Sequence, residues 1–332
     1  MPAVAQTNES TVSIVIRCYN EEQHIGRLLT GLLKQSVRPH QIVIVDSGST
    51  DATLAIASRF PVEIHTIDPD SFSFGRSLNI GCRAATGDLI AIVSAHVYPV
   101  YDTWLEELTK PFGAEEIALA YGRQLGNEVT KYSERQILAR WFPAQSEARQ
   151  SHPFCNNANA AIRRNAWELQ PYDEDLTGLE DIDWANRALG RGLGLSYVAT
   201  APVVHAHDEA WSQLVNRYRR EAIAHHRIFH EERMGLIEAS RLAASNIASD
   251  YYHAARDGVL SSNLVSIPWF RIAQFRGAYQ GFIRRGEAPA VLRQRFYYPH
   301  GIRRARPEEA PPGAHLVDYE ETAIREAHDR PD

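Results

Sequence analysis

The sequence predicts an α/β fold in which a mostly parallel sheet is flanked by helices and followed by a C-terminal helical extension. Two observations carry this prediction. Short, β-branched and almost continuously apolar runs recur through the first hundred residues, as in strands covered on both faces. Between the first two runs, isoleucine and leucine recur at helical spacing, which makes a strand–helix–strand unit with a right-handed crossover.

The elements follow in order along the chain. Strands are expected at the four apolar runs, residues 12–16, 42–45, 62–67 and 89–93. Helices are expected where apolar or small residues recur every three to four positions, at residues 25–33, from 49–51 onward, after 72–79, from 180 to about 190, at 211–234 and at 236–253. Ser49 and Asp51 suit the N-cap of the second helix.

Composition restricts the class of protein. The chain has 332 residues, of which 44% are hydrophobic and 23% charged, as in soluble globular proteins. Its net charge of −6 gives no reason to expect nucleic acid as a partner. No apolar run could span a bilayer, residues 1–10 lack the apolar core of a signal peptide, and the three cysteines lack disulfide or zinc spacing. We expect a cytoplasmic protein, with the inner face of the membrane as an alternative location.

Polar residues gather where three of the predicted strands end. They occupy residues 17–22, 46–51 and 94–96. Ligands of open α/β sheets bind beyond the carboxyl ends of the strands, so a ligand site is expected at this edge. The sequence contains neither G-x-G-x-x-G nor G-x-x-x-x-G-K-[ST], which excludes the dinucleotide fingerprint and the P-loop.

Two residues near this edge could contact a nucleotide. Asp46 can accept from the N–H of a base or from ribose hydroxyls; alternatively it forms an Asx-turn before the next helix. Arg76 could pair with a phosphate, for which arginine has suitable geometry; alternatively it is a surface residue.

A later stretch, residues 178–184, concentrates acidic side chains at the start of a predicted helix. Glu180, Asp181 and Asp183 fall in its first turn, where the helix dipole favours carboxylates. We interpret Asp181, with Glu180 beside it, as a base that accepts a hydroxyl proton. The alternative is ordinary charge decoration of a surface helix.

These clusters together resemble the family 2 glycosyltransferases of GT-A fold, and most closely their rhamnosyltransferase-like members. The matching segments are residues 12–22, 42–53, 75–88, 156–163, 179–187 and 203–207. Their order and spacing carry the resemblance, which covers roughly residues 12–230.

The resemblance implies a nucleotide-sugar donor. The donor site would comprise Asn20, Glu21, Glu22, Asp46, Ser49, Arg76, Asn79, Ser94 and Ala95, with Asp46 on the nucleobase. The Glu180–Asp181 pair would supply the base, with Asp181 preferred. Substrate would also contact Asn156, Asn157, Asn159 and Trp184, unless the asparagines form a turn-rich loop and the tryptophan lies in the core.

The sequence departs from the family at the Asp-x-Asp motif that normally holds a divalent cation. Ser94-Ala95-His96 stands there instead. In one interpretation His96 and His205, or His207, bind a metal, and Mn²⁺ is then expected over Mg²⁺, which prefers oxygen. In a second, no metal binds, and a protonated His96 or an arginine stabilises the leaving diphosphate. In a third, His96 is a hydrogen-bonded loop residue.

The resemblance implies transfer of a hexose-like sugar, with inversion, to a hydroxyl of a glycan or lipid-linked glycan, as in polysaccharide biosynthesis. One alternative is a sugar nucleotidyltransferase, but its Gly-rich loop with Arg and Lys is absent near the N-terminus. Another is a non-catalytic nucleotide-sugar-binding module, which the missing Asp-x-Asp suggests and the intact Glu180–Asp181 pair disfavours.

The expected domains are residues 1–230, catalytic; 231–306, a helical extension; and 307–332, a disordered acidic tail. Residues 271–306 hold nine arginines against one acid, with aromatic residues interleaved. This composition suits peripheral membrane contact through residues 265–306. The alternative is a helical hairpin that packs on the catalytic domain or on a second subunit of a homo-oligomer. Arg217, Arg219 and Arg220, in the preceding helix, could reach the diphosphate or an anionic acceptor; alternatively, at least one of them lies on a solvated face.

Overall fold

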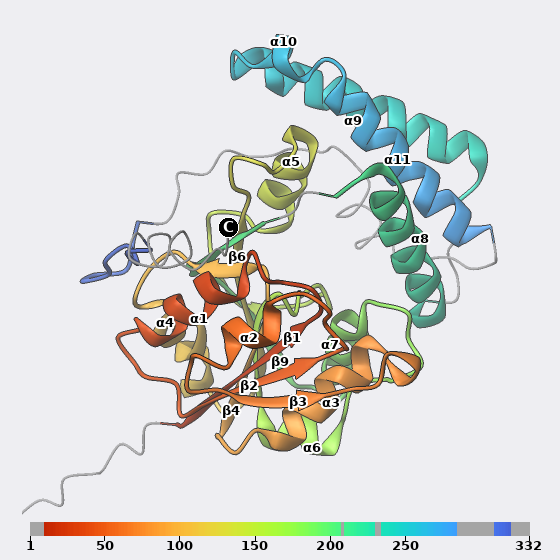
Figure 1. The fold of residues 1–332 in the computed structure, drawn as a ribbon. Coiled ribbons are helices and arrows are strands. Elements are labelled where there is room, and N and C mark those ends of the chain that lie inside the picture. Colours follow the sequence, from red (N-terminus) through yellow and green to blue (C-terminus); the bar gives the residue numbers. More distant parts are fainter. Residues whose placement is uncertain (1–9, 207–208, 230–233, 284–308, 320–332) are drawn as a thin grey trace, which may run out of the picture.

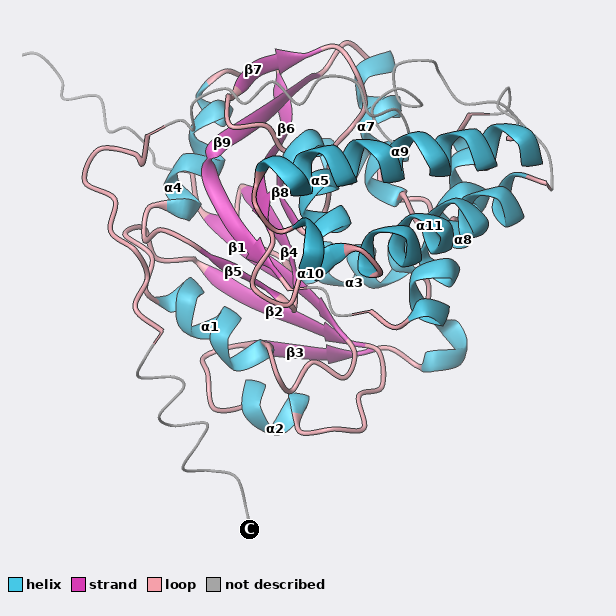
Figure 2. Ribbon diagram, turned by 90° about the horizontal axis from the view of Figure 1, so that it is seen from above, coloured by secondary structure: helices cyan, strands magenta, loops and turns pink. Residues whose placement is uncertain are grey.

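The computed structural model of the chain describes residues 10–206, 209–229, 234–283 and 309–319. Its centre is a nine-stranded sheet with the order β3-β2-β1-β4-β8-β6-β9-β5, and β7 pairs with β9 beside this path (Figure 2). The strands are β1 Val12–Cys18, β2 Gln41–Asp46, β3 Glu63–Thr66, β4 Leu89–Ser94, β5 Val97–Pro99, β6 Ile117–Leu125, β7 Glu147–Gln150, β8 Asn159–Arg163 and β9 Gly194–His205.

The four strands predicted from the apolar runs are confirmed. β1 pairs in parallel with β2 and β4, and β2 pairs in parallel with β3. Consecutive residues of β1 enter different cores, because Val15 joins the cluster on one face of the sheet and Ile14 and Ile16 join the cluster on the other. Burial on both faces explains why these strands read as continuous apolar runs.

Helices cover both faces of the sheet, as Figures 1 and 2 show. They are α1 Ile25–Leu33, α2 Thr53–Ala57, α3 Phe74–Ala84, α4 Trp104–Thr109, α5 Tyr132–Trp141, α6 Arg164–Leu169, α7 Glu180–Gly190, α8 Trp211–Ile228, α9 Leu236–Arg256, α10 Leu260–Asn263 and α11 Ser266–Phe282. α3 begins after Ser73, whose hydroxyl accepts from the N–H of Arg76 as an N-cap. α8 ends at Ile228, before the predicted limit near residue 234.

A helical layer formed by α5, α8, α9 and α11 lies on one side of the molecule, apart from α1, α2 and α4 (Figure 1). Arg271 of α11 is 1% exposed and pairs with Asp250 of α9 at 2.7 Å. Phe270 and Phe275 are also buried within this layer. The membrane-facing interpretation is therefore wrong for these residues, which pack as a helical hairpin on the rest of the chain. Seven of the nine arginines fall in residues 284–306, outside the described residues. Within the described residues, every helix is too short or too polar to cross a bilayer.

The C-terminal strap, residues 309–319, corrects the predicted disordered tail. Leu316 forms an antiparallel bridge with Tyr101, and the hydroxyl of Tyr319 donates to the carbonyl of Pro99 at 2.7 Å. The strap lies beside α1 and α4 (Figure 1, blue). The tail was predicted from its Pro and Glu content, but Leu316, Val317 and Tyr319 give this part enough contacts to be ordered. Residues 320–332 lie outside the described residues.

Candidate active site

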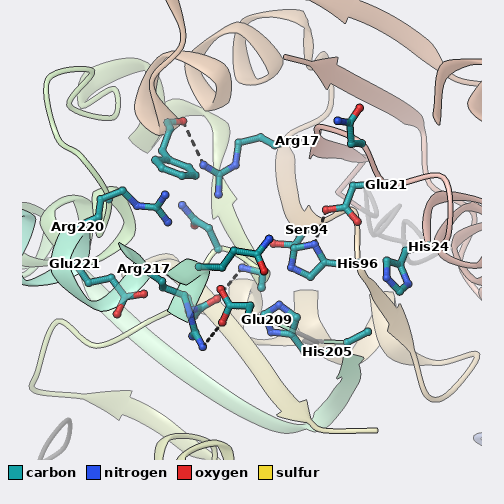
Figure 3. A pocket seen from close by; sticks show the side chains of 18 of the residues that line it. Arg17, Glu21, His24, Ser94, His96, His205, Glu209, Arg217, Arg220 and Glu221 are labelled. Atoms are coloured by element: carbon teal, nitrogen blue, oxygen red, sulfur yellow. Dashed lines mark hydrogen bonds and ion pairs between the residues drawn. The ribbon is translucent and has the colours of Figure 1, made fainter. Parts of the chain in front are cut away.

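A polar groove of about 740 Å³ opens at the sheet edge where β1 and β4 end. Segments far apart in sequence line it: the loop after β1 (Asn20 to His24), the turn after β4 (Ser94 and His96), the residues before β8 (Asn156 to Ala158), the start of α7 (Gly178 to Asp181), the end of β9 (His205 and Ala206) and α8 (Gln213, Arg217, Arg220 and Glu221). Figure 3 shows several of these side chains converging on one space. The predicted ligand edge and the predicted catalytic helix thus meet.

Glu180 and Asp181 are the first two residues of α7, and both line the groove. They follow Leu179, whose φ of +56° is unusual for a residue with a branched side chain. Such conformations cost energy and cluster at functional sites. The carboxylate of Asp181 accepts from the N–H of Asn157 at 3.0 Å and from the N–H of Ile182 at 2.8 Å. The backbone therefore holds this carboxyl group in one orientation.

The electrostatic environment separates the two acids. Glu180 forms an ion pair with Arg17 of β1 at 3.1 Å. Burial, together with the neighbouring Glu180 carboxylate, raises the pKa of Asp181 from 3.8 to about 7, although the N–H groups of Asn157 and Ile182 and the charge of Arg17 act in the opposite direction. A general base is most effective when its pKa lies near the working pH. Asp181 can therefore take up a proton near neutrality.

Two histidines form the opposite part of the groove. The rings of His96 and His205 are stacked, with centroids 4.9 Å apart and an interplanar angle of 19°. Nδ1 of His96 lies 2.7 Å from a carboxylate oxygen of Glu21, and Nδ1 of His205 lies 2.7 Å from the amide oxygen of Gln124. Since both partners are acceptors, we assign the hydrogen of each ring to Nδ1 and the lone pair to Nε2.

This arrangement resembles the supporting contacts of metal-binding histidines, which commonly donate their second N–H to a carboxylate or carbonyl. The two imidazoles suit a transition-metal ion better than Mg²⁺. In the part of the chain that the structure describes, no three His, Cys, Asp or Glu side chains are grouped so that they could hold a metal. The donors present therefore fit a metal only if a substrate or water completes the set. His207 lies outside the described residues.

The loop after β1 is fixed to the loop after β2. Asn20, with φ of +54°, accepts from the N–H of Thr50 at 2.8 Å and donates its own N–H to the hydroxyl of Ser49. Glu22 accepts from the N–H of Ala52 at 2.9 Å. Asn20, Glu21 and Glu22 line the groove, whereas Ser49 supports them from outside its lining.

Besides Ser49, the structure places four more of the predicted donor-site residues outside the groove lining. Asp46 is 1% exposed and accepts from the N–H groups of Gly48 and Ser49 at 2.9 Å, which is the Asx-turn alternative. Asn79 is buried, and its amide contacts the carbonyl of Tyr172 at 2.9 Å. Two further residues also fall outside the lining, the buried Ala95 and the exposed Arg76.

The predicted substrate-binding residues divide in the same way. Asn156 and Asn157 line the groove. Asn159 is fully buried in β8, where it accepts from the indole N–H of Trp104 and donates to the carbonyl of Ala201, both at 2.9 Å. Trp184 is also fully buried, and its indole N–H donates to the carbonyl of Gln170. The core alternative therefore holds for Trp184, and Asn159 acts as a structural amide.

Arg17 and Phe74 line the groove but had no predicted role, whereas Arg217 and Arg220 are two of the three arginines expected to reach the diphosphate or the acceptor, and both line the groove. The guanidinium carbons of Arg17 and Arg220 lie 5.0 and 4.5 Å from the centroid of the Phe74 ring. Arg217 lies between the carboxylates of Glu134 and Glu209, at 2.8 and 2.6 Å. The only available signal was the recurrence of Arg217 and Arg220 three residues apart on one helix. Arg17 fell within the predicted polar cluster 17–22 without a role of its own, and Phe74 gave no signal, because their contacts with each other and with the groove arise through long-range packing.

A further carboxyl group, Glu221, lines the groove from α8. Burial raises its pKa, and the charges of Arg217 and Arg220 oppose this shift. Figure 3 shows Arg217, Arg220 and Glu221 on the side of the groove opposite Glu21, His24 and His96. The groove therefore has two ends of different chemistry.

Comparisons with known proteins agree with this architecture. A family model described as "Glycosyl transferase family 2" matches residues 13–169. The chain is 29% identical over 205 residues to the O-antigen chain rhamnosyltransferase WbaN of Salmonella anatum, which covers 58% of this chain and 64% of that protein. It is 24% identical over 227 residues to the O-antigen chain rhamnosyltransferase RfbN of Salmonella typhimurium. This aligned region covers 64% of this chain and 72% of RfbN. The chain thus spans about two thirds of the length of these relatives.

Among solved structures, the mannosyltransferase PcManGT from Pyrobaculum calidifontis, in complex with GDP-Man and Mn²⁺, is similar with a TM-score of 0.57 and 17% identity. The likeness covers 83% of this chain and 88% of that one, and at this identity it shows the fold. The mixed, mostly parallel sheet between helices is the predicted GT-A fold. Residues 13–169 of this chain match glycosyl transferase family 2.

Proposed function

We propose that the protein transfers a sugar from a nucleoside-diphosphate donor to a hydroxyl group of a glycan, with inversion at the anomeric carbon. The observation that carries this proposal is the buried Asp181, whose pKa lies near 7 at the start of α7 in a polar groove. A sugar nucleotidyltransferase has no need of a base poised to deprotonate an acceptor hydroxyl, and a simple binding module has no need of a base at all.

The donor occupies the end of the groove near β1. Asn20, Glu22 and Asp51 offer oxygen acceptors for a nucleoside, and the diphosphate then points toward Ser94 and His96. Because the relatives WbaN and RfbN are named rhamnosyltransferases, a nucleotide-activated rhamnose is the first donor to test. O-antigen chains in those names also suggest polysaccharide synthesis as the setting.

The proton follows a short path. The carboxylate of Asp181 takes the proton of the acceptor hydroxyl while that oxygen attacks C1 of the donor sugar. The new C1–O bond forms on the face opposite the breaking bond between C1 and the diphosphate oxygen, and the diphosphate leaves with the electron pair. A positioned base contributes about 10²–10⁴ in rate. Glu180, paired with Arg17, keeps the pKa of Asp181 high enough for this transfer.

His96 and His205 are the residues that would hold a divalent ion, with Mn²⁺ favoured over Mg²⁺. When bound, such an ion neutralises charge on a leaving diphosphate. The Nδ1 hydrogen bonds to Glu21 and Gln124 support this proposal, because they direct the lone pair of each ring to Nε2. If activity were indifferent to EDTA and to added Mn²⁺, the metal-free alternative would stand instead.

The acceptor lies along α8. Arg220 stacks on Phe74, and within the described ranges no carboxylate is ion-paired with it. Its charge therefore remains available for an anionic group on the acceptor, such as a phosphate or a uronate. Arg217, in contrast, is paired with two carboxylates and serves to order this end of the groove.

Replacement of Asp181 by Asn tests the proposal. Transfer should fall by about 10²–10⁴, while the donor still binds. Asp183→Asn is the matched control, because Asp183 lies in the same helical turn, pairs with Arg187 at 2.7 Å and does not line the groove. Near-normal turnover of Asp181→Asn, measured by release of nucleoside diphosphate, would contradict the assignment.

A further inference from the structure

The C-terminal strap closes one edge of the molecule through contacts with the chain just after β5. The N–H of Asp102 donates to the carbonyl of His315 at 2.9 Å, and the N–H of His315 returns to the Asp102 carboxylate at 2.8 Å. The N–H of Val317 donates to the carbonyl of Val100 at 3.1 Å. Together with the bridge from Tyr101 to Leu316, these bonds make a short antiparallel ladder.

Tyr319 anchors the end of the strap against β5 and α1. Its hydroxyl donates to the carbonyl of Pro99 at 2.7 Å, and its ring meets Tyr98 edge to face at 5.4 Å. The guanidinium of Arg27 lies 3.8 Å from the centroid of the Tyr98 ring and 4.8 Å from that of Tyr319. α1 contributes a glycine at the contact, since a Cβ built at Gly31 would overlap the Tyr319 hydroxyl. This site admits the phenol only because residue 31 lacks a side chain.

The same short strand links the strap to the histidine pair, because His96 immediately precedes β5 and His205 ends β9, the strand with which β5 pairs. β5 pairs antiparallel with β9 in a register that sets Val97 opposite His205 and Pro99 opposite Val203. The N–H of Ala206 donates to the carbonyl of His96 at 3.0 Å, directly at the end of this ladder. β5 has only three residues, and it is held between β9 on one side and the chain bound by the strap on the other, so contacts of the strap can be transmitted to the adjacent His96.

We propose that the strap is a positioning element for the stacked His96–His205 pair, with Tyr319 as its anchoring residue. It acts through β5, and it thereby sets the affinity of the groove for the diphosphate part of the donor. This proposal rests on the proposed function, because the histidines are assigned there to the diphosphate end. None of the strap residues lines the groove, so their effect is indirect.

Three variants of the full chain test the proposal. Tyr319→Ala removes the anchor, and Gly31→Ala displaces the phenol from the α1 side without any change in the strap. Leu316→Ala is the matched control, because Leu316 belongs to the strap but its side chain is 73% exposed. Tyr319→Phe removes only the hydrogen bond to Pro99 and replaces Tyr319→Ala if that variant does not fold.

Two measurements are made well below the melting temperature. The first is amide hydrogen exchange, by mass spectrometry, in peptides that cover residues 94–100 and 203–206. The second is the dissociation constant for UDP, GDP or dTDP, whichever binds the wild type most tightly, with and without Mn²⁺. Changes along a contiguous network alter such couplings by about 2- to 30-fold. We expect Tyr319→Ala and Gly31→Ala to weaken binding within this range and to speed exchange in both peptides, and Leu316→Ala to change binding by no more than about twofold.

A double-mutant cycle separates positioning from simple stabilisation. In a His96→Ala background, Tyr319→Ala should no longer weaken diphosphate binding, because the residue through which it acts is gone. A lower melting temperature with unchanged exchange and unchanged affinity would overturn the proposal, and so would an equal loss of affinity with and without His96. Failure of the wild type to bind any of the three nucleotides would instead contradict the proposed function, and the exchange measurement would still test the strap.

Discussion

The Asp181→Asn variant should be more stable than the wild type above neutral pH, although we expect it to lose most of its transfer activity. In the native protein Asp181 is buried and lies beside Glu180, and its pKa is about 7 instead of 3.8. An ionised Asp181 with this raised pKa costs the native protein about 4 kcal/mol of free energy relative to the unfolded chain. Replacement by a neutral amide removes that cost.

Part of the gain is offset by hydrogen bonding. The two oxygens of Asp181 accept from the N–H groups of Asn157 and Ile182. An asparagine offers one oxygen and one NH₂, so one N–H loses its acceptor at a cost of about 1–3 kcal/mol. We therefore expect the variant to be more stable by about 1–3 kcal/mol at pH 8.

The stability difference between Asp181→Asn and the wild type should depend on pH. Between about pH 4 and pH 7 the native protein holds the proton of Asp181 while the unfolded chain has released it, so the stability of the wild type falls as the pH rises through this window. The advantage of Asp181→Asn should shrink by about 2–3 kcal/mol from pH 8 to pH 5 and be lost there. Urea unfolding at both pH values measures it. A variant that is less stable at pH 8, or a difference independent of pH, would refute the raised pKa.

Three further predictions concern the groove and its support. The value of kcat/KM should rise with pH through about 7 as Asp181 ionises. Glu180→Gln should move this rise to lower pH, because it removes a neighbouring negative charge. A wild-type profile that is flat from pH 5 to 9 would contradict the assignment of the base. Arg220→Ala should raise the KM of an anionic acceptor by about 10- to 100-fold. Arg219→Ala is the control, because Arg219 is exposed and lies outside the groove lining. If the two variants had equal KM values for the acceptor, Arg220 would not belong to the acceptor site. Asn159→Ala should lower the free energy of unfolding by about 2–4 kcal/mol, since it leaves the indole N–H of Trp104 and the carbonyl of Ala201 without their hydrogen bonds to Asn159. The affinity for the donor should stay within about threefold of the wild-type value. Calorimetry that shows no loss of stability would count against the structural role of Asn159.

The parallel half of the sheet could be predicted from the sequence, because strands buried on both faces have continuous apolar sequences, such as Ile42 to Val45. β8 has no such apolar run. Among its five residues, Asn159 to Arg163, only Ile162 is β-branched, and the strand exists through antiparallel pairing with β4 and β6. Its predicted role as a substrate loop came from the motif, and only the three-dimensional pairing shows a central strand.

For the site as well, only roles that depend on adjacent residues could be predicted from the sequence. Glu180 and Asp181 were predictable, because a carboxylate pair at a helix start follows from adjacent residues. Asp46 and Trp184 have the chemistry to meet a ligand, but the same chemistry satisfies a turn and a core hydrogen bond. Only distances distinguish these uses. The contact of Arg17 with Glu180 joins β1 to α7 and has no local signature at all.

The strap also has a consequence for biosynthesis. The described hydrogen-bond partners of His315 and Tyr319, Asp102 and Pro99, are made more than two hundred residues earlier. A nascent chain on the ribosome must therefore carry an open sheet edge beside β5 until synthesis has passed residue 319. Open edges invite pairing with other chains, so this interval is when the polypeptide most needs a chaperone.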